Sequence, residues 1–186
     1  MVADASDLAA LEAAFTDLGT LDHLVVAVSG GSGAGPFRDL ALRDLQSGFA
    51  GKVWPQLNTV QAALPHLRPD GSVTFVTSVS TRSAQPGTAG LAAVNGALEA
   101  MVPTLAVELS PLRVNAVAPG VIRTAWWNFL PEQEREDTFT SYADGTPAGR
   151  VGEPADVADA ILFLTGNSYV TGVVLPCDGG LRLARR

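Results

Sequence analysis

Four short apolar runs, separated by segments with helical patterns, constrain the fold of this chain more than any other feature. The runs are rich in valine, as strands buried on both faces are: Leu24–Val28, Val73–Thr77, Val114–Ala118 and Val173–Pro176. Helical patterns occupy the segments before and between them: Ser6–Leu18, Leu42–Leu67, Thr88–Leu109 and Pro154–Leu164. Strands that alternate with helices predict an α/β fold, in which a doubly wound, Rossmann-like parallel sheet lies between two layers of helices.

Prolines and polar residues refine the predicted helices. Pro55 lies inside Leu42–Leu67 and removes one backbone donor, so we expect a kink there. Asp4 or Ser6 is expected to cap the first helix, and Pro154 suits the first turn of the last helix.

The composition indicates a globular protein and limits its partners. Of its 186 residues, 47% are hydrophobic and 17% are charged, which predicts one folded domain over residues 1–186. A net charge of −7 argues against nucleic acids and anionic membranes as partners, and no apolar run reaches the roughly 18 residues of a membrane span. The single Cys177, expected only to pack, favours a cytoplasmic location. The isolated His23 and His66 predict no metal site.

Ligands of parallel sheets bind beyond the carboxyl ends of the strands, so the segments that follow the strands matter most for function. The first of them, Ser29–Pro36, is rich in glycine, but Pro36 stands where the dinucleotide fingerprint needs its last glycine. We therefore interpret Ser29–Pro36 as a flexible loop that passes close to a ligand, and not as a phosphate-binding motif.

Three polar residues are candidates for chemistry. Ser78 follows a buried strand, so its hydroxyl is expected to point into the ligand crevice. Asn95 lies on the same helix face as Leu91, and it is either a packing residue or a hydrogen-bond donor toward ligand or water. Lys52 is either exposed, as most lysines are, or partly buried beside Trp54, where its lowered pKa would suit an acid or base.

The segment after the third strand carries a turn and an aromatic cluster. Pro119 and Gly120 fit a sharp turn out of the sheet, which would bring Thr124 to the crevice. Three aromatic residues follow, and they either line an apolar substrate pocket or mobile lid, or pack on the core or a partner chain: Trp126, Trp127 and Phe129.

These segments together resemble the short-chain dehydrogenase/reductase family over nearly the whole chain. VTFVTSVS resembles its fifth strand with the catalytic Ser, RVNAVAPGVIRT its sixth strand with a Pro-Gly-x-x-x-Thr tail, and YVTGVVLPCDGG its last strand. The resemblance implies hydride transfer with NAD or NADP. It also implies that Asp4 contacts the adenine and that the turn from Pro119 and Gly120 presents Ile122 and Thr124 to the nicotinamide carboxamide.

The chain departs from the family at the catalytic tetrad of Asn, Ser, Tyr and Lys. Lys52 occupies the position of the Asn, and Ser78 is retained. Leu91 and Asn95 occupy the positions of the Tyr and the Lys. Leucine donates no proton, so the proton must come from Lys52 or from a water held by Asn95. The Asn and Lys have exchanged places, which favours a rearranged site over random decay.

The family's first two strands, their helices and its Gly-rich loop have no counterpart in this sequence. We therefore expect the chain to derive from a longer parent and to expose Leu24–Val28 at a sheet edge. The resemblance also implies a homo-oligomer, a dimer or tetramer, joined through Leu42–Leu67 and Thr88–Leu109.

The sequence is compatible with three functions. The first is an oxidoreductase that acts on a small-molecule carbonyl or alcohol. The second is a non-catalytic scaffold or oligomer subunit, which the lost Tyr and phosphate loop favour. The third is a lyase or isomerase that uses the crevice without a cofactor. Only Lys52 and the tryptophans support it.

Overall fold

The computed structural model describes residues 2–184, which form a parallel four-stranded sheet in the order β1-β2-β3-β4. The strands follow the order of the chain: β1 (Leu21–Val26), β2 (Leu67–Val76), β3 (Arg113–Pro119) and β4 (Val174–Cys177). All three strand pairs are parallel, with Val73 opposite both Leu24 and Val114. This arrangement confirms the predicted α/β fold and all four predicted strands.

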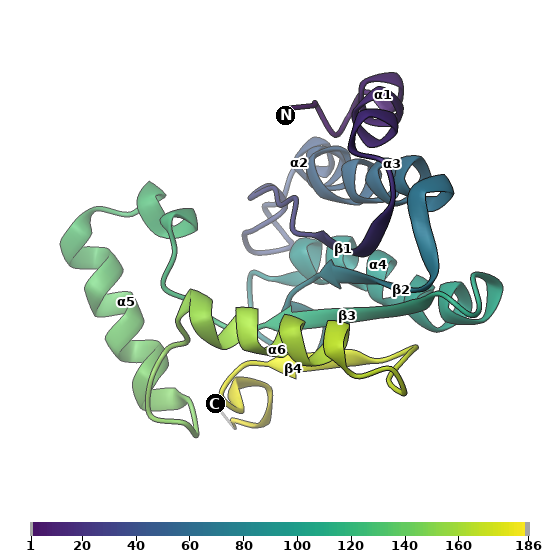
Figure 1. Ribbon diagram of the computed structural model, residues 1–186. Coiled ribbons are helices and arrows are strands. Elements are labelled where there is room, and N and C mark those ends of the chain that lie inside the picture. Colours follow the sequence, from purple (N-terminus) through teal and green to yellow (C-terminus); the bar gives the residue numbers. More distant parts are fainter. Residues whose placement is uncertain (1, 185–186) are drawn as a thin grey trace.

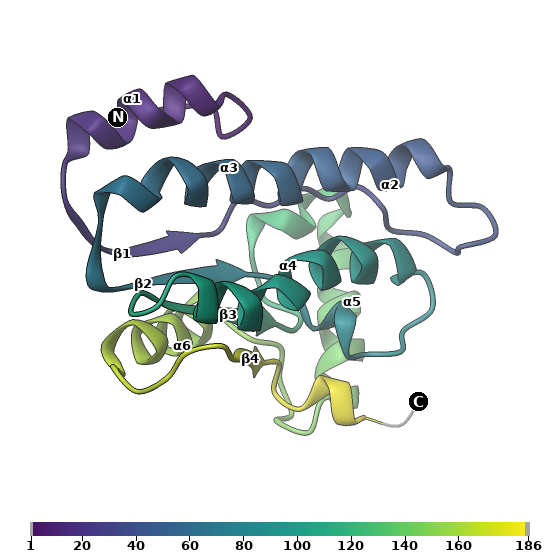
Figure 2. The same ribbon diagram turned by 90° about the vertical axis from the view of Figure 1, so that its right-hand side faces the viewer.

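Helices cover the sheet on both faces, as Figures 1 and 2 show. On one face α3 (Trp54–Ala63) packs on β1 and β2, and α4 (Ala89–Glu108) packs on β3. The core between them includes side chains that are fully buried: Val73, Phe75, Leu98 and Val102. On the other face α6 (Pro154–Gly166) contacts β2, β3 and β4, and it lies in front of the strands in Figure 1.

Two further helices lie away from the sheet. In the first, α1 (Leu8–Leu18), the side chains of Leu11 and Phe15 are buried where the helix packs on α3. The second, α5 (Glu132–Gly145), stands at one side of the molecule in Figure 1, and most of its residues are exposed. Asp7 caps α1 by accepting a hydrogen bond from the Ala10 amide, so the expectation that Asp4 or Ser6 caps it is wrong. The Asp4 carboxylate instead accepts bonds from Ser6, one turn earlier.

The long helical region around Pro55 contains a widened turn. Helix α2 (Leu42–Gly48) continues through a π-helical segment, Phe49–Val53, into α3, and Figure 2 shows the two helices in line. The Trp54 amide bonds to the Phe49 oxygen five residues back, and Pro55, which has no N–H, follows directly. The bend that we expected at Pro55 is therefore replaced by this π-helical segment before it.

Two expectations concern apolar surface. By length and composition alone α4 could cross a membrane, contrary to the expectation that no segment could. In the fold, however, α4 covers the sheet, and core helices of α/β domains share these properties. Strand β1 lies at the edge of the sheet, as expected, with Val25 41% exposed.

Candidate active site

A cavity of about 520 Å³ lies at the carboxyl ends of β1, β2 and β3, and we call it the crevice. Residues from both strand ends and helices line it. The lining includes ten residues singled out in the sequence: Lys52, Ser78, Leu91, Asn95, Pro119, Gly120, Ile122, Thr124, Trp126 and Trp127. The crevice therefore gathers all four positions of the family tetrad from three separate segments of the chain.

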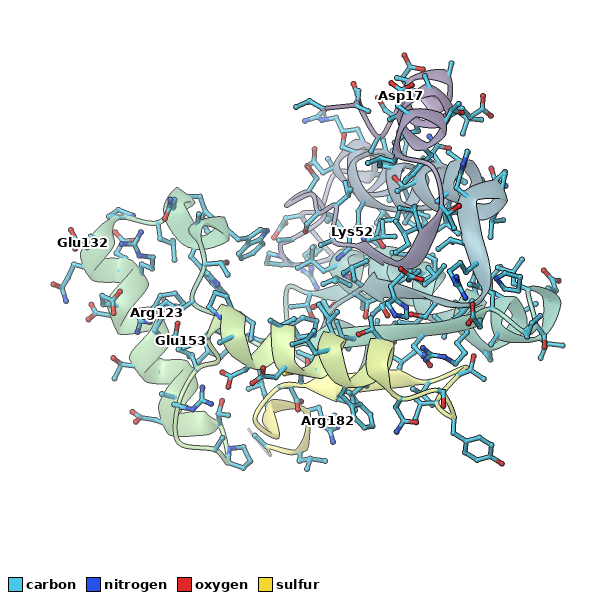
Figure 3. The ribbon with its side chains drawn as sticks, viewed as in Figure 1. Asp17, Lys52, Arg123, Glu132, Glu153 and Arg182 are labelled. Carbon is cyan, nitrogen blue, oxygen red and sulfur yellow. The ribbon has the colours of Figure 1, made fainter. Side chains whose placement is uncertain are left out.

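Lys52 is almost completely buried, with 5% of its surface exposed. It belongs to the π-helical segment, and its Nζ donates a hydrogen bond to the main-chain oxygen of Thr77 at 3.2 Å. Burial lowers the pKa of Lys52 to about 8, although the negative charge of Glu99 partly opposes this. Of the two settings considered for Lys52, the structure thus shows the buried one, and Figure 3 labels Lys52 inside the molecule.

A buried carboxylate lies behind the end of β2. Glu99 on α4 is 8% exposed and accepts hydrogen bonds from the Thr77 and Thr81 hydroxyls at 2.8 and 2.9 Å. The Arg82 guanidinium also donates to it, which completes an ion pair in which only the carboxylate is buried. Thr77 therefore connects Lys52 and Glu99, because its main-chain oxygen accepts from one and its hydroxyl donates to the other.

Ser78 follows β2 and lines the crevice, as predicted. Its Oγ accepts a hydrogen bond from the Ser80 amide at 3.2 Å, which orients the hydroxyl oxygen. Leu91 on α4 lines the same crevice and offers no polar atom. A substrate oxygen beside Ser78 can therefore receive a hydrogen bond from the serine but no proton from position 91.

Asn95 is 4% exposed and lies one helical turn after Leu91. Its Nδ2 donates to the Leu91 oxygen at 2.8 Å, whereas its Oδ1 has no hydrogen-bond partner in the described chain. The Oγ of Ser80, also in the lining, is another buried polar atom without a partner in residues 2–184. Because unpaired buried polar atoms are costly, these two atoms are places where water or a polar ligand would bind.

The turn after β3 is held close to the C-terminal part of the chain. A Cβ on Gly120 would lie 2.8 Å from the Asp178 Cα, so only glycine fits at this position. The Gly120 amide bonds to the Cys177 oxygen, and Ile122 pairs with Gly152 in an isolated bridge. These contacts fix the turn that brings Ile122 and Thr124 to the crevice.

Aromatic residues close one side of the crevice. Trp126 and Trp127 line it with ring centroids 4.8 Å apart, and Trp127 Nε1 donates to the Ile122 oxygen at 3.0 Å. Phe129 contacts both indole rings but is 65% exposed and is not part of the lining. Of the roles expected for these aromatic residues, the structure shows Trp126 and Trp127 lining the pocket.

Asp4 is the one predicted site residue that the structure does not bring to the crevice. Its side chain is exposed, and hydrogen bonds from the Ser6 amide and hydroxyl lower its pKa. Cys177 also lies outside this crevice; it is partly buried, and burial raises its pKa. Within residues 2–184, no group of three or more His, Cys, Asp or Glu side chains is placed to hold a metal ion.

The sequence interpretation missed several residues of the site. Glu99 was overlooked because nothing in its helical context shows that its carboxylate turns toward the end of β2. Tyr142 and Gln85 line the crevice and share a hydrogen bond, although they are separated by 57 positions in the chain. Only a prediction of how α5 sits against the crevice would have identified this pair.

Comparisons with known proteins agree on one family. Residues 1–182 match the model of a family described as enoyl-(acyl carrier protein) reductase. A 3-oxoacyl-(acyl-carrier-protein) reductase of Thermotoga maritima is 41% identical over 130 residues, which are 67% of this chain and 51% of that protein. A 3alpha-hydroxysteroid dehydrogenase of Mediterraneibacter gnavus is 39% identical, again over 67% of this chain and 51% of that protein.

A solved structure of similar fold extends the comparison. The crystal structure of a small-chain dehydrogenase in complex with NADPH superposes with a TM-score of 0.93 at 33% identity, covering 98% of this chain and 83% of that one. In the two curated relatives, by contrast, the match spans about half of each protein's own length.

Proposed function

The chain belongs to the short-chain dehydrogenase/reductase family, and from that premise we propose that it transfers hydride between NAD or NADP and a small carbonyl compound or alcohol in the crevice. The observation that carries the proposal is the meeting of Lys52, Ser78 and Asn95 with the turn from Pro119 to Thr124 in one cavity. A reactive carbonyl at Ser78 would lie among all of these groups.

The residues of the crevice divide the chemistry among them. The nicotinamide cofactor supplies or accepts the hydride when bound. Ser78 donates a hydrogen bond to the substrate oxygen and polarises the carbonyl. The proton that the new alcohol requires comes from the Lys52 ammonium group or from a water bonded to Asn95, because Leu91 has none to give.

The lining suits the nicotinamide end of a cofactor and a largely apolar substrate. The unpartnered Asn95 Oδ1 and Ser80 Oγ fit polar groups of a ligand, and Ile122 and Thr124 would hold the nicotinamide end. Asp4 is not part of this lining, and its proposed contact is with the adenine. Trp126 and Trp127 favour a substrate with an apolar or ring-shaped body.

A second function is favoured by one specific observation, which is the aliphatic Leu91 at the position of the family's proton donor. In this alternative the chain is a non-catalytic subunit of a homo-oligomer, joined through α2, α3 and α4. Exposed apolar side chains on this surface, such as Trp54 and Val107, would then be covered. In either role we place the protein in the cytoplasm.

The test of the first function is to titrate the chain with NADPH and NADH while following tryptophan fluorescence, and then to assay a panel of small ketones and aldehydes. We expect saturable binding of one cofactor and slow reduction that Ser78→Ala weakens by roughly 10²-fold or more. The absence of both binding and turnover in a folded chain would overturn the oxidoreductase. Light scattering at micromolar concentration tests the subunit: a strict monomer contradicts it.

A further inference from the structure

Lysine occurs only once in this chain. The sequence has twelve basic residues, of which Lys52 is the lysine and the rest are arginine. Arginine stays protonated in proteins and is no nucleophile, so Lys52 carries the only side-chain amine that can react. Figure 3 shows it in the interior, whereas Asp17, Glu132 and Arg182 lie at the periphery.

The surroundings of this amine leave it reactive. Its one hydrogen bond goes to the neutral Thr77 oxygen, and no carboxylate in residues 2–184 lies within ion-pair distance of Nζ. The nearby Glu99 carboxylate is already bonded to Arg82 and two threonines. Burial without a direct counter-ion favours the neutral amine, whose lone pair is the nucleophile.

The geometry points to a covalent site: we propose that Lys52 captures small aldehydes and ketones in the crevice as a Schiff base. Three observations support it together, namely the burial of the sole lysine, its place on the wall of a cavity of about 520 Å³, and its π-helical segment. π-Helical segments within α-helices are frequently found at functional sites. The proposal goes beyond hydride transfer and needs no nicotinamide.

The reaction balances without an oxidant or reductant. The Nζ lone pair forms a bond to the carbonyl carbon, while the C=O π electrons move to the oxygen. That oxygen takes up a proton and the nitrogen releases one, which gives a carbinolamine. The carbinolamine then loses its hydroxyl group and the remaining N–H proton as water, which gives the C=N bond, so that carbonyl and amine yield imine and water. Ser78 can exchange these protons, and Asn95 Oδ1 can accept a hydrogen bond from the carbinolamine.

The experiment is reductive trapping on the full chain. The protein is incubated with butanal or acetone and sodium cyanoborohydride at about pH 7.5, and the labelled position is found by peptide mass spectrometry. We expect Lys52 to be labelled faster in the folded chain than in the urea-unfolded chain, by roughly tenfold or more, because unfolding restores an ordinary lysine pKa. The N-terminal amine maps to a different peptide.

An internal standard keeps the result independent of folding defects. Arg43 is 85% exposed in its side chain, so the Arg43→Lys variant adds one solvent-exposed amine to an otherwise intact protein. Lys52 should be labelled before this second amine, and Lys52→Arg should remove the adduct from the crevice peptide. Labelling of the exposed amine with an unlabelled or slower Lys52 would overturn the proposal. The assay contains no NAD or NADP, so failure of hydride transfer is a separate result.

Discussion

The Lys52 Nζ donates a hydrogen bond to the main-chain oxygen of Thr77 at 3.2 Å, which joins the only lysine to the last residue before Ser78. The Thr77 hydroxyl in turn donates to Glu99 at 2.8 Å. Thr77 therefore holds the Lys52 amine and the Glu99 carboxylate in place beside Ser78. The link depends on the π-helical segment, which carries Lys52 on the helix that faces the end of β2.

The stability of the protein should rise with pH through the titration of Lys52. Its pKa is about 8 in the folded chain and 10.5 as its ordinary value. Below pH 8 both states are protonated, and the fold bears the full cost of burying the ammonium group. Between the two values the unfolded state holds more protons, so the free energy of unfolding increases with pH, by roughly 3 kcal/mol in total.

Urea unfolding of the wild type and of Lys52→Met at about pH 7 and pH 10 measures this rise. The difference between the two proteins isolates Lys52, because the other titrating groups are shared. We expect Lys52→Met to be the more stable protein near pH 7 and to lose that advantage near pH 10. If the unfolding free energies of the wild type and of Lys52→Met depend equally on pH, the folded protein does not bury a charged Lys52.

Glu99 should control the pKa of Lys52. Its negative charge raises that pKa against the effect of burial, so Glu99→Gln is expected to lower the midpoint of the Lys52 titration further. The same change weakens the bonds from Arg82 and costs roughly 1–3 kcal/mol of stability. Glu108→Gln, at an exposed position of the same helix, is the control and should change neither quantity. An unchanged midpoint in Glu99→Gln contradicts the electrostatic link.

The sequence predicts the sheet and about half of the residues of this site. The residues it misses depend on contacts between elements that are far apart in the chain. Ser78 and Asn95 are identified because their spacing along the chain matches the pattern of the family that the sequence resembles. The burial of Lys52 is left open, because neither the π-helical segment that contains it nor the direction of its side chain has a local signal in the sequence. Glu99 and Tyr142 depend on how distant elements pack, so no local pattern reveals them.

Restoring the family tetrad should raise the rate of hydride transfer. The triple variant Lys52→Asn, Leu91→Tyr, Asn95→Lys returns a phenol to the crevice, and general acid catalysis is worth roughly 10²–10⁴-fold. The measurement is ketone reduction with NADPH or NADH. The matched control carries Phe in place of Tyr at position 91, which keeps the ring and removes the proton. Equal turnover in both triple variants would show that position 91 does not reach the substrate oxygen.

The start of α4 should not tolerate a side chain at Gly90. A Cβ there would overlap the main-chain oxygen of Gly33, whose own φ of +100° favours glycine. Gly90→Ala is therefore expected to cost roughly 1–3 kcal/mol in unfolding free energy and to displace the loop beside the crevice. Gly145→Ala is the control, because its Cβ meets no atom within 4 Å and α5 should gain from alanine. Equal stability of the two variants would show that the loop moves aside freely.

Arg113 should hold the far end of α6, whose other end lines the crevice through Pro154 and Val157. Arg113 is 8% exposed, and its guanidinium donates to the main-chain oxygens of Leu164, Thr165 and Val170 at 2.7, 2.7 and 3.1 Å. The first two are carbonyls of the last helical turn, which have no partner inside the helix.

A lysine at this position cannot reproduce the planar fork that reaches all three oxygens, so the charge would persist with fewer bonds. We therefore expect Arg113→Lys to lower the unfolding free energy by roughly 2–4 kcal/mol and to speed amide hydrogen exchange over the last turn of α6. Arg43→Lys, at an exposed position, should stay within about 0.5 kcal/mol of the wild type. Unchanged exchange in Arg113→Lys would mean that α6 is held by packing of Leu164 alone, because that side chain is fully buried against the sheet.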